Sequence, residues 1–193
     1  DGVGLGKTFV GLMLIERLVL HEGKRVVLFA PKATKEGVWE PHLRQWLPHI
    51  GGVGGGADFS NLAVFSQTDL GRKGDFPERF RRIAELADVV LIDEAHHFRN
   101  SGTRGDDGKE PSRYYRLFDL LDNAERPKTV FMLTATPINN RLSDFRHMAE
   151  LFTRRDEAYF ARTIGVNNLR AHFTQMEKAL RSKVGQDLTD VAE

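Results

Sequence analysis

The N-terminal segment DGVGLGKT has the composition and spacing of a loop that binds phosphate groups. Glycines let backbone N–H groups approach phosphate oxygens closely, and a helix starting near Lys7 adds the partial positive charge of its first turn. In such loops the lysine, here Lys7, reaches the β and γ phosphates, and the next hydroxyl, here Thr8, coordinates Mg²⁺. Asp1 replaces the first glycine of the general pattern, so an ordinary glycine-rich turn is the alternative interpretation. The residues predicted to bind the nucleotide are Gly4, Leu5, Gly6, Lys7 and Thr8.

A second pattern, DEAH, covers Asp93–His96 and follows the most hydrophobic run of the chain. Ligands of open α/β sheets bind beyond the carboxyl ends of strands, and two adjacent acids are costly there unless they serve a cation or a reaction. We expect Asp93 to hold Mg²⁺ through water, and Glu94 to orient and deprotonate an attacking water, as phosphoryl transfer requires. The alternative is a strand that ends at a helix N-cap, where the helix dipole favours acids.

The third pattern, TATP, covers Thr134–Pro137 after another hydrophobic run. Its hydroxyl groups can hydrogen-bond to a phosphate or to other motif residues, although TATP alone is typical of an ordinary strand end. All three patterns occur in the expected order, each beside a predicted strand end or helix start, and this makes coincidence improbable. Together they predict a phosphoryl-transfer site with Lys7, Asp93 and Glu94 as its catalytic residues.

The hydrophobic pattern predicts the elements that must position these residues. Four apolar runs are continuous rather than alternating, which is typical of strands buried on both faces of a parallel sheet. They are Arg25–Ala30, Leu62–Phe65, Val89–Asp93 and Thr129–Leu133. Helical spacing predicts helices at Thr8–Leu20, Trp39–Leu47, Pro77–Ala87, Ser112–Leu121 and Ser143–Phe152. The alternation predicts a doubly wound α/β fold, in which helices flank a parallel sheet.

Two of the predicted helices carry expectations about burial. Thr8–Leu20 is apolar nearly all round in its first half, so we expect it to be deeply packed. Trp39 and Trp46 could stack on nucleic-acid bases. Their helical spacing among Leu43 and Leu47 instead favours a place in the core.

Two segments are predicted to be loops. Gly51–Gly56 is not followed by Lys-Ser or Lys-Thr, so it is expected to be a flexible connector and not a second phosphate loop. Phe98–Pro111 is polar and rich in glycine, and we expect it to be mobile. The basic residues between Phe98 and Arg116 are mixed with acidic ones, which favours a solvated loop over a nucleic-acid contact.

The C-terminal part of the chain departs from the strand–helix alternation, which stops after Phe152. An amphipathic helix is predicted over Asn167–Lys183. Its apolar stripe consists of Leu169, Phe173, Met176 and Leu180. We therefore expect a lobe over residues 1–152 and a helical extension or inter-lobe segment over residues 153–193.

Composition restricts the class of protein. The chain has 28 Lys and Arg residues and 27 Asp and Glu residues. The resulting net charge of +1 neither supports nor excludes nucleic acid as a partner. The absence of cysteine excludes a disulfide framework and a thiolate metal site, and His96–His97 lacks a third ligand at the spacing of a zinc site. No apolar run approaches the roughly 20 residues that span a bilayer, so no membrane partner is expected.

Five segments, including the three patterns, occur together in one known family. They are GLGKT (Gly4–Thr8), FAPKATKEGVWEPHLRQW (Phe29–Trp46), VFSQTDL (Val64–Leu70), IDEAHHFRN (Ile92–Asn100) and LTATPINN (Leu133–Asn140). Through them the chain resembles the first RecA-like lobe of superfamily 2 helicases, specifically of the Swi/Snf-like branch, over residues 1–152. TATP stands where eukaryotic remodellers commonly have Thr-Gly-Thr-Pro, which indicates bacterial or archaeal relatives.

The resemblance implies a role for each matching residue. Those that match the binding pattern for ATP and Mg²⁺ are Gly4, Gly6, Lys7 and Thr8. Asp93 and Glu94 match the acids that support hydrolysis. His96 resembles a histidine that links the ATP site to the nucleic-acid site, and Thr134 and Thr136 match the motif that couples hydrolysis to movement between lobes. The residues that match segments contacting the nucleic-acid backbone are Pro31, Lys32, Ser66 and Gln67.

The function implied by the resemblance is an ATP-dependent motor that moves along double-stranded DNA. An RNA helicase of the same superfamily and a non-catalytic, nucleotide-gated scaffold are the alternatives, and the intact acid pair weighs against the scaffold. The family's adenine-recognising segment and second RecA-like lobe have no counterpart here, and the residues not expected to replace that lobe's arginine are Arg141, Arg154 and Arg155. We therefore expect a piece of a longer, cytoplasmic, nucleoid-associated protein, with little hydrolysis by the piece alone.

Overall fold

The described residues form a fold built around a sheet of parallel strands. The computed structural model describes residues 6–50, 61–105, 108–122, 126–135 and 142–190. The strands are β1 (Val26–Ala30), β2 (Leu62–Ser66), β3 (Val89–Asp93) and β4 (Thr129–Leu133), in the order β2-β1-β3-β4. Each neighbouring pair is parallel. The predicted strands and their parallel arrangement are thus confirmed, with bounds that differ by at most one residue.

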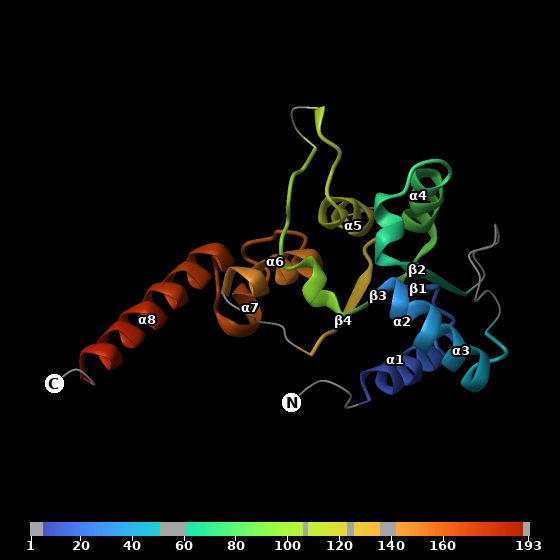
Figure 1. Ribbon diagram of the computed structural model, residues 1–193, viewed down its shortest axis with the longest axis horizontal. Helices are drawn as coiled ribbons and strands as arrows, with labels where there is room; N and C mark the ends of the chain where they lie inside the picture. Colours follow the sequence, from blue (N-terminus) through green and yellow to red (C-terminus); the bar gives the residue numbers. More distant parts are fainter. Residues whose placement is uncertain (1–5, 51–60, 106–107, 123–125, 136–141, 191–193) are drawn as a thin grey trace.

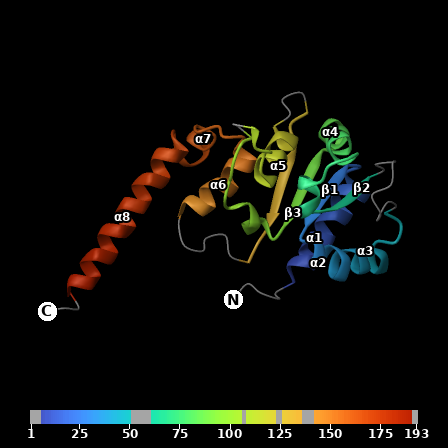
Figure 2. The ribbon, with the colours of Figure 1, turned by 45° about the horizontal axis from the view of Figure 1, so that its top comes forward.

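Helices cover both faces of this sheet (Figures 1 and 2). One face carries α1 (Lys7–Glu16), a π-helical turn (Arg17–His21), α2 (Lys32–Thr34), a second π-helical turn (Lys35–Trp39) and α3 (Glu40–Trp46). The other face carries α4 (Phe76–Leu86), α5 (Arg113–Leu121) and α6 (Leu142–Thr153). Turns of 3₁₀ helix follow β2 and β3, at Gln67–Gly71 and Ala95–Phe98. This architecture confirms the predicted doubly wound α/β fold.

Side chains of β1 alternate between the two hydrophobic clusters that hold the layers together. Val27 and Phe29 belong to the cluster on the α4, α5 and α6 face, whereas Val26 and Leu28 belong to the cluster on the α1 and α3 face. None of these four side chains has measurable exposed surface. Successive side chains of a strand point to opposite faces, so a continuous apolar run is what a sheet covered on both sides requires.

The first helix packs on one side only, which contradicts the deep packing expected for Thr8–Leu20. Its α-helical part, α1, ends at Glu16. The residues of α1 that are buried against the sheet are Gly11, Leu12 and Ile15. Met13 is 69% exposed, and Phe9 and Val10 are also exposed. A helix lying on one face of a sheet buries a single stripe, so apolar composition on its other side does not produce burial.

Trp39 and Trp46 have opposite environments. Trp39 is completely buried, as predicted. Trp46 is 55% exposed, so the prediction that it belongs to the core was wrong. It is the last residue of α3, and its ring meets the exposed Phe9 ring edge-on with centroids 6.4 Å apart, outside the cluster that contains Trp39.

Beyond α6 the chain forms α7 (Ala161–Ile164) and α8 (Leu169–Asp190), and α8 projects away from the sheet (Figures 1 and 2). Leu169 and Phe173 are buried with Ala149 of α6 in a third hydrophobic cluster. Met176 and Leu180 are exposed, so the predicted apolar stripe is buried only in its first half. None of the described helices has both the length and the apolar character of a membrane span.

The two predicted loops differ in what the structure describes. Gly51–Gly56 lies outside the described residues. Phe98, at the start of the second loop, is buried at the end of a 3₁₀ turn. Ser112 then caps α5 by accepting a hydrogen bond from the Tyr115 N–H.

Candidate nucleotide-binding site

The carboxyl edge of the sheet brings together residues from all three sequence patterns. β3 ends at Asp93, β4 ends just before Thr134, and α1 begins at Lys7. Lys7 Nζ lies 3.7 Å from Glu94 Oε1, and His96 Nδ1 lies 3.2 Å from Thr134 Oγ1. Because parallel strands end at a common edge, segments far apart in sequence form one site there.

The described end of the phosphate loop has a backbone conformation that glycine accommodates. Gly6 has a φ of +76°, in the left-handed region where a residue with a Cβ is strained. No atom lies within 4 Å of the position that a Cβ would take, so conformation rather than crowding favours glycine. α1 begins at the next residue, Lys7, which places the partial positive charge of the helix at the end of the loop. Gly4 and Leu5 lie outside the described residues.

Asp93 is a buried carboxylate, 6% exposed, whose two oxygens each accept a hydrogen bond. Trp39 Nε1 donates to Oδ2 at 2.8 Å, and the Glu94 N–H donates to Oδ1 at 3.0 Å. Burial raises the pKa of Asp93 above its ordinary value; the Trp39 hydrogen bond opposes this effect, and the charge of Glu94 adds to it. A cation beside Asp93 would favour its charged form, which is the electrostatic setting of a metal-binding acid.

Glu94 has a backbone conformation that is uncommon for a residue with a Cβ. Its φ of +47° lies in the left-handed region, and such strain clusters at functional sites. Its Oε1 faces Lys7, whereas Oε2 is buried without a hydrogen-bond donor. His96 Nδ1 lies 3.1 Å from Oε2 but not in hydrogen-bonding geometry. A water molecule at this position would supply the missing donor.

The oxygen ligands of the site fit a Mg²⁺ ion that is held largely by phosphate and water. The hydroxyl of half-buried Thr8 and the carboxylate of Asp93 are hard oxygen ligands, which Mg²⁺ prefers. Among the described residues, no group of three or more His, Cys, Asp or Glu side chains could hold a metal ion. Mg²⁺ commonly keeps several waters and uses one or two carboxylates together with substrate phosphates, so a sparse protein ligand set is sufficient.

Ser66 and Gln67, predicted to contact nucleic acid, lie inside the protein. Gln67 is 1% exposed; its Nε2 donates to the Asp93 carbonyl at 2.7 Å, and its Oε1 accepts from His97 Nδ1 at 2.8 Å. Ser66 is also buried, and its hydroxyl accepts a hydrogen bond from the Thr68 N–H at the start of the 3₁₀ turn. Neither side chain is exposed in this structure, and a contact of either one with nucleic acid stays a prediction. Gln67 joins the end of β2 to the end of β3.

Pro31 and Lys32, the other predicted nucleic-acid contacts, follow the carboxyl end of β1. Lys32 is exposed at the start of α2, and its Nζ lies 4.0 Å from Oε1 of Glu36, which is also exposed. An exposed ion pair of this kind contributes little stability, so the ammonium group can turn towards another anion at small cost. Thr136, the second threonine of TATP, lies outside the described residues.

Two arginines that follow α6 are held within the lobe. Arg154 donates to the carbonyls of Leu121 and Lys128, at 3.0 and 2.8 Å. The Arg155 guanidinium lies over the Phe118 ring, 4.7 Å from its centroid. Both side chains therefore have structural partners in this lobe, and Arg141 lies outside the described residues.

Sequence reasoning placed Trp39 in the core but missed its hydrogen bond to Asp93. The indole N–H of a buried tryptophan needs an acceptor, and a carboxylate at the end of a buried strand needs donors. These two requirements are visible in the sequence, and matching them could have identified the pair.

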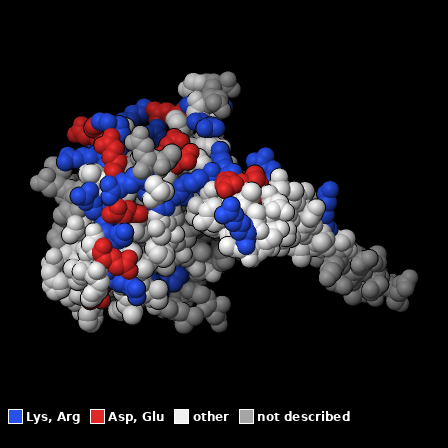
Figure 3. Space-filling model, turned by 180° about the vertical axis from the view of Figure 1, so that it is seen from behind, with Lys and Arg blue, Asp and Glu red and all other residues white. Residues whose placement is uncertain are grey.

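The charged surface does not by itself mark a path for nucleic acid. Figure 3 shows Lys and Arg side chains mixed with Asp and Glu side chains on one face, rather than a continuous basic stripe. Ion pairs such as Arg81–Glu78 and Arg116–Glu110 also place opposite charges side by side. The assignment of nucleic-acid contacts therefore depends on particular residues and not on overall charge.

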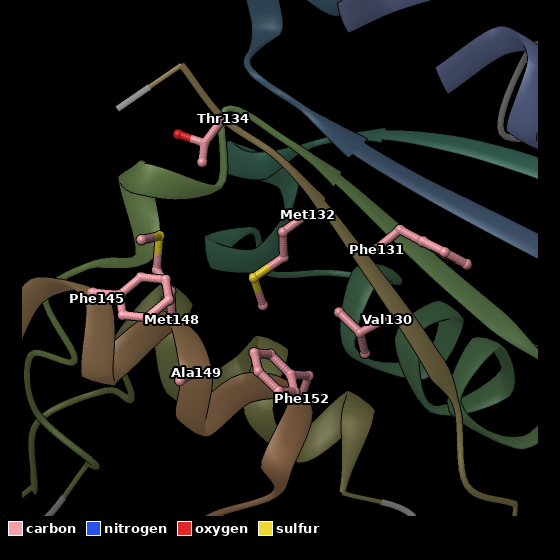
Figure 4. Close-up of a pocket in the computed structure, with 8 residues that line it drawn as sticks. All are labelled: Val130, Phe131, Met132, Thr134, Phe145, Met148, Ala149 and Phe152. Carbon is pink, nitrogen blue, oxygen red and sulfur yellow. The ribbon is translucent and has the colours of Figure 1, made fainter. Parts of the chain in front are cut away.

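A separate cavity of about 360 Å³ lies between β4 and α6 (Figure 4). Its lining consists of Val130, Phe131, Met132, Thr134, Phe145, Met148, Ala149 and Phe152. Figure 4 shows Val130 and Met132 facing the α6 side chains, with Thr134 at one end. Phosphate requires cations or N–H groups, and this largely apolar lining does not supply them, so the cavity is not assigned to the nucleotide.

Comparison with known proteins decides the family. The model of the family "Type III restriction enzyme, res subunit" matches residues 2–139, which include the three patterns. The chain belongs to this family. This membership, together with the relatives described next, supports the resemblance to the first RecA-like lobe of superfamily 2 helicases.

Proteins similar to this chain include an RNA polymerase-associated protein and an ATP-dependent helicase of bacteria. The RNA polymerase-associated protein RapA of Photobacterium profundum is 28% identical over the whole chain, which spans 20% of that protein. The uncharacterized ATP-dependent helicase YqhH of Bacillus subtilis is 28% identical over 78% of the chain and 25% of its own length. The chain thus spans about a quarter or less of the length of these relatives.

A solved structure with a similar fold is the Sulfolobus solfataricus SWI2/SNF2 ATPase core in complex with double-stranded DNA. The TM-score is 0.60 at 19% sequence identity, and the match covers 86% of this chain and 33% of that one. At this level of identity the likeness concerns the fold, and it confirms the RecA-like α/β architecture.

Proposed function

We propose that this chain is the ATP-binding lobe of a motor that hydrolyses ATP to move along double-stranded DNA. The observation that carries the proposal is the set of contacts at the sheet edge, which links Lys7 to Glu94 and His96 to Thr134. Family membership supports ATP as the nucleotide. Intact acids argue against a purely structural nucleotide switch, which would not need them.

The side chains divide the chemistry among them. Glu94 takes the proton from the attacking water and orients that water for in-line attack. Lys7 neutralises charge that develops on the terminal phosphates as the bond to the leaving group breaks. Thr8 and Asp93 would hold Mg²⁺, which supplies charge neutralisation and orients the phosphates when it is bound.

The link between His96 and Thr134 offers a route from hydrolysis to movement. Thr134 leads directly from β4 towards the rest of the TATP segment, and His96 follows the catalytic acids. A movement of Glu94 on loss of the γ phosphate would therefore reach β4 through His96, whose Nδ1 lies 3.1 Å from Glu94 Oε2 and 3.2 Å from Thr134 Oγ1. We propose that a second RecA-like lobe in the natural protein uses this contact to sense the nucleotide.

Double-stranded DNA is proposed as the track because the SWI2/SNF2 core with the same fold was solved in complex with it. Pro31 and Lys32 remain the proposed contacts to its sugar–phosphate backbone, since they are placed beyond the end of β1 and Lys32 is exposed. We also propose a cytoplasmic, nucleoid-associated location. RNA as the track is an alternative outcome of the test below.

The deciding experiment measures the ATPase rate of the natural protein with duplex DNA, single-stranded DNA and RNA. We expect duplex DNA to stimulate turnover most. Glu94→Gln should lower turnover by about 100-fold or more, because a general base contributes at least that factor. Glu85→Gln, an exposed acid on α4, is the matched control and should behave like the wild type. Stimulation by RNA alone would overturn the DNA assignment, and full turnover in Glu94→Gln would overturn the catalytic one.

A further inference from the structure

Trp39 occupies a position between the two halves of the proposed ATP site. Its indole is completely buried, and its Nε1 donates a hydrogen bond of 2.8 Å to Oδ2 of Asp93. On its other side the ring packs against α1, where a Cβ added at Gly11 would collide with Trp39. One ring therefore touches both the helix that starts at Lys7 and the acid at the end of β3.

We infer that Trp39 is a positioning residue that fixes the Asp93 carboxylate for Mg²⁺ binding by donating its indole N–H to Oδ2. The inference rests on the proposed function of the site and deepens it. A buried indole is a donor only, so it holds Asp93 as an acceptor and cannot compete with it for the cation. The Glu94 N–H fixes Oδ1 at 3.0 Å, so the two donors together define the plane of the carboxylate.

The two donors restrain Asp93 in different ways. The Glu94 N–H belongs to the residue next along the chain, so it moves with Asp93. The Trp39 indole comes from a separate element 54 residues away and is itself immobilised by the core. Groups of this kind, which orient a metal-binding side chain without touching the metal, typically change metal affinity or activity by about 10–100-fold when they are removed.

The close approach of Gly11 to the Trp39 ring is a second observation, and it shows that α1 restricts where the indole can lie. An added Cβ at this α1 residue would meet the Trp39 ring and would lie 3.0 Å from Leu133 Cδ1 of β4. Only glycine at this point lets α1 approach the ring so closely. The spacing between the phosphate-loop helix and Asp93 is thus set partly by the thickness of one indole ring.

The ordinary alternative is that Trp39 is a core side chain whose hydrogen bond merely satisfies a buried group. That role and the positioning role both predict loss of stability on substitution. They differ in the Mg²⁺ dependence of nucleotide binding, which only a positioning role would change. Leu43, equally buried in the same cluster and four residues further on, is the matched control for a cavity alone.

The test uses the natural protein with Trp39→Phe, Leu43→Ala and Trp46→Phe. A fluorescent, non-hydrolysable ATP analogue is titrated at a series of Mg²⁺ concentrations, and the Mg²⁺ dependence of ATP turnover is measured in parallel. We expect Trp39→Phe to raise the half-saturating Mg²⁺ concentration by about 10-fold in both assays. We expect Leu43→Ala and exposed Trp46→Phe to leave it within about twofold of the wild type. Equal Mg²⁺ dependence in Trp39→Phe and Leu43→Ala would overturn the inference.

A second replacement keeps the test decisive if Trp39→Phe does not fold. Benzothienylalanine at position 39 keeps the bicyclic shape of the indole but carries sulfur in place of the N–H, so it removes the donor without opening a cavity. Because no cavity is opened, a raised Mg²⁺ requirement would support positioning, and an unchanged Mg²⁺ requirement would refute it. Glu94→Gln, measured alongside, separates the two ideas: full turnover in that variant would refute the proposed function, whatever the result at Trp39.

Discussion

The carboxyl ends of β1 and β3 lie at the same edge of the sheet, but their side chains are held very differently. At the end of β3, Asp93 is buried and accepts hydrogen bonds from Trp39 and Glu94, while Gln67 donates to its carbonyl. At the end of β1, Lys32 is exposed, and its ion pair with Glu36 is long and open to solvent. The Asp93 side chain at the end of β3 is held by the core, whereas the Lys32 side chain at the end of β1 can exchange its ion-pair partner.

The difference matches two kinds of task. Phosphoryl transfer requires groups that stay in place while charge develops, and a buried, fully hydrogen-bonded acid provides that. A contact that must be made and released as a motor steps needs a side chain that can change partner at little cost, and an exposed lysine provides that. The contrast between these two strand ends can be tested by removing side chains from each.

The largest effect is expected at the acid pair at the end of β3, which Lys7 faces. Lys7→Ala removes the ammonium group that faces Glu94 and that we propose to reach the terminal phosphates of ATP. We expect ATP turnover by the natural protein to fall about 100–1,000-fold, the usual cost of removing a charge-stabilising group from a transition state. Steady-state kinetics with saturating duplex DNA measures this effect. Lys24→Ala, an exposed lysine before β1, is the control, and an equal loss there would remove the distinction.

A smaller effect on turnover is expected from Gln67→Ala. This change leaves the Asp93 carbonyl and His97 without their partner and loosens the end of β3. We expect about a 10-fold loss of turnover and a loss of about 1–3 kcal/mol in the free energy of unfolding, because a buried polar group becomes unsatisfied.

The DNA affinity of Gln67→Ala distinguishes a role of Gln67 in holding the end of β3 from the predicted contact with nucleic acid. A buried Gln67 that acts on Asp93 should leave the DNA dissociation constant, measured by fluorescence anisotropy, within about twofold of the wild type. A fall in DNA affinity with intact turnover would establish Gln67 as a nucleic-acid contact.

At the end of β1, where Lys32 is exposed, Lys32→Ala should weaken DNA binding. We expect affinity for duplex DNA to fall by a few-fold, and the slope of log affinity against log salt to decrease by about one unit. The loss should be uniform across DNA sequences, since a phosphate contact carries no sequence information. Salt titrations of binding by wild type, Lys32→Ala and Lys24→Ala make the comparison, and an unchanged slope in Lys32→Ala would exclude a phosphate contact.

The smallest effect is expected at the opposite end of β3. Burial alone would raise the pKa of Asp88, but hydrogen bonds from the Arg25 N–H and from Arg126 hold it below the ordinary value of 3.8. A carboxyl group with a lowered pKa in the folded state stabilises the protein above its ordinary pKa. This contribution is lost as the pH falls through the lowered value.

Asp88→Asn should therefore remove part of the acid sensitivity, about 1 kcal/mol or less of unfolding free energy, measured by urea unfolding between about pH 3 and pH 6. Glu16→Gln, at an exposed acid that ends α1, is the control and should leave the pH profile unchanged. An identical pH profile in Asp88→Asn would show that the pair at this strand end adds no stability.

Much of the fold follows from local patterns in the sequence. Val26–Ala30 and Val89–Asp93 are apolar on both faces, and only a sheet covered by helices on two sides can bury such runs. The strand ends then determine where Asp93 and Thr134 must lie, because parallel strands share a carboxyl edge. Hence the proximity of the three patterns was predictable from their order and context.

The failures concern side chains whose burial depends on where an element ends. Trp46 has the helical spacing of a core residue, but α3 stops at that position. Ser66, which ends β2, and Gln67, which begins the 3₁₀ turn, are both buried, and no local pattern in the sequence specified this burial. Sequence periodicity specifies which side of an element is apolar, whereas tertiary contacts decide which part of that side is covered.

The position of β4 has a consequence for handling the chain outside its natural context. Among the described strands β4 is at the end of the order, so it pairs with β3 on one side only. An open strand edge next to apolar side chains is a template for pairing with another chain. We therefore expect the 193-residue polypeptide, produced alone, to self-associate as its concentration rises. Replacing Thr129, the exposed residue of β4, with lysine adds a charge beside that edge and should keep the polypeptide dispersed to higher concentration in light-scattering measurements.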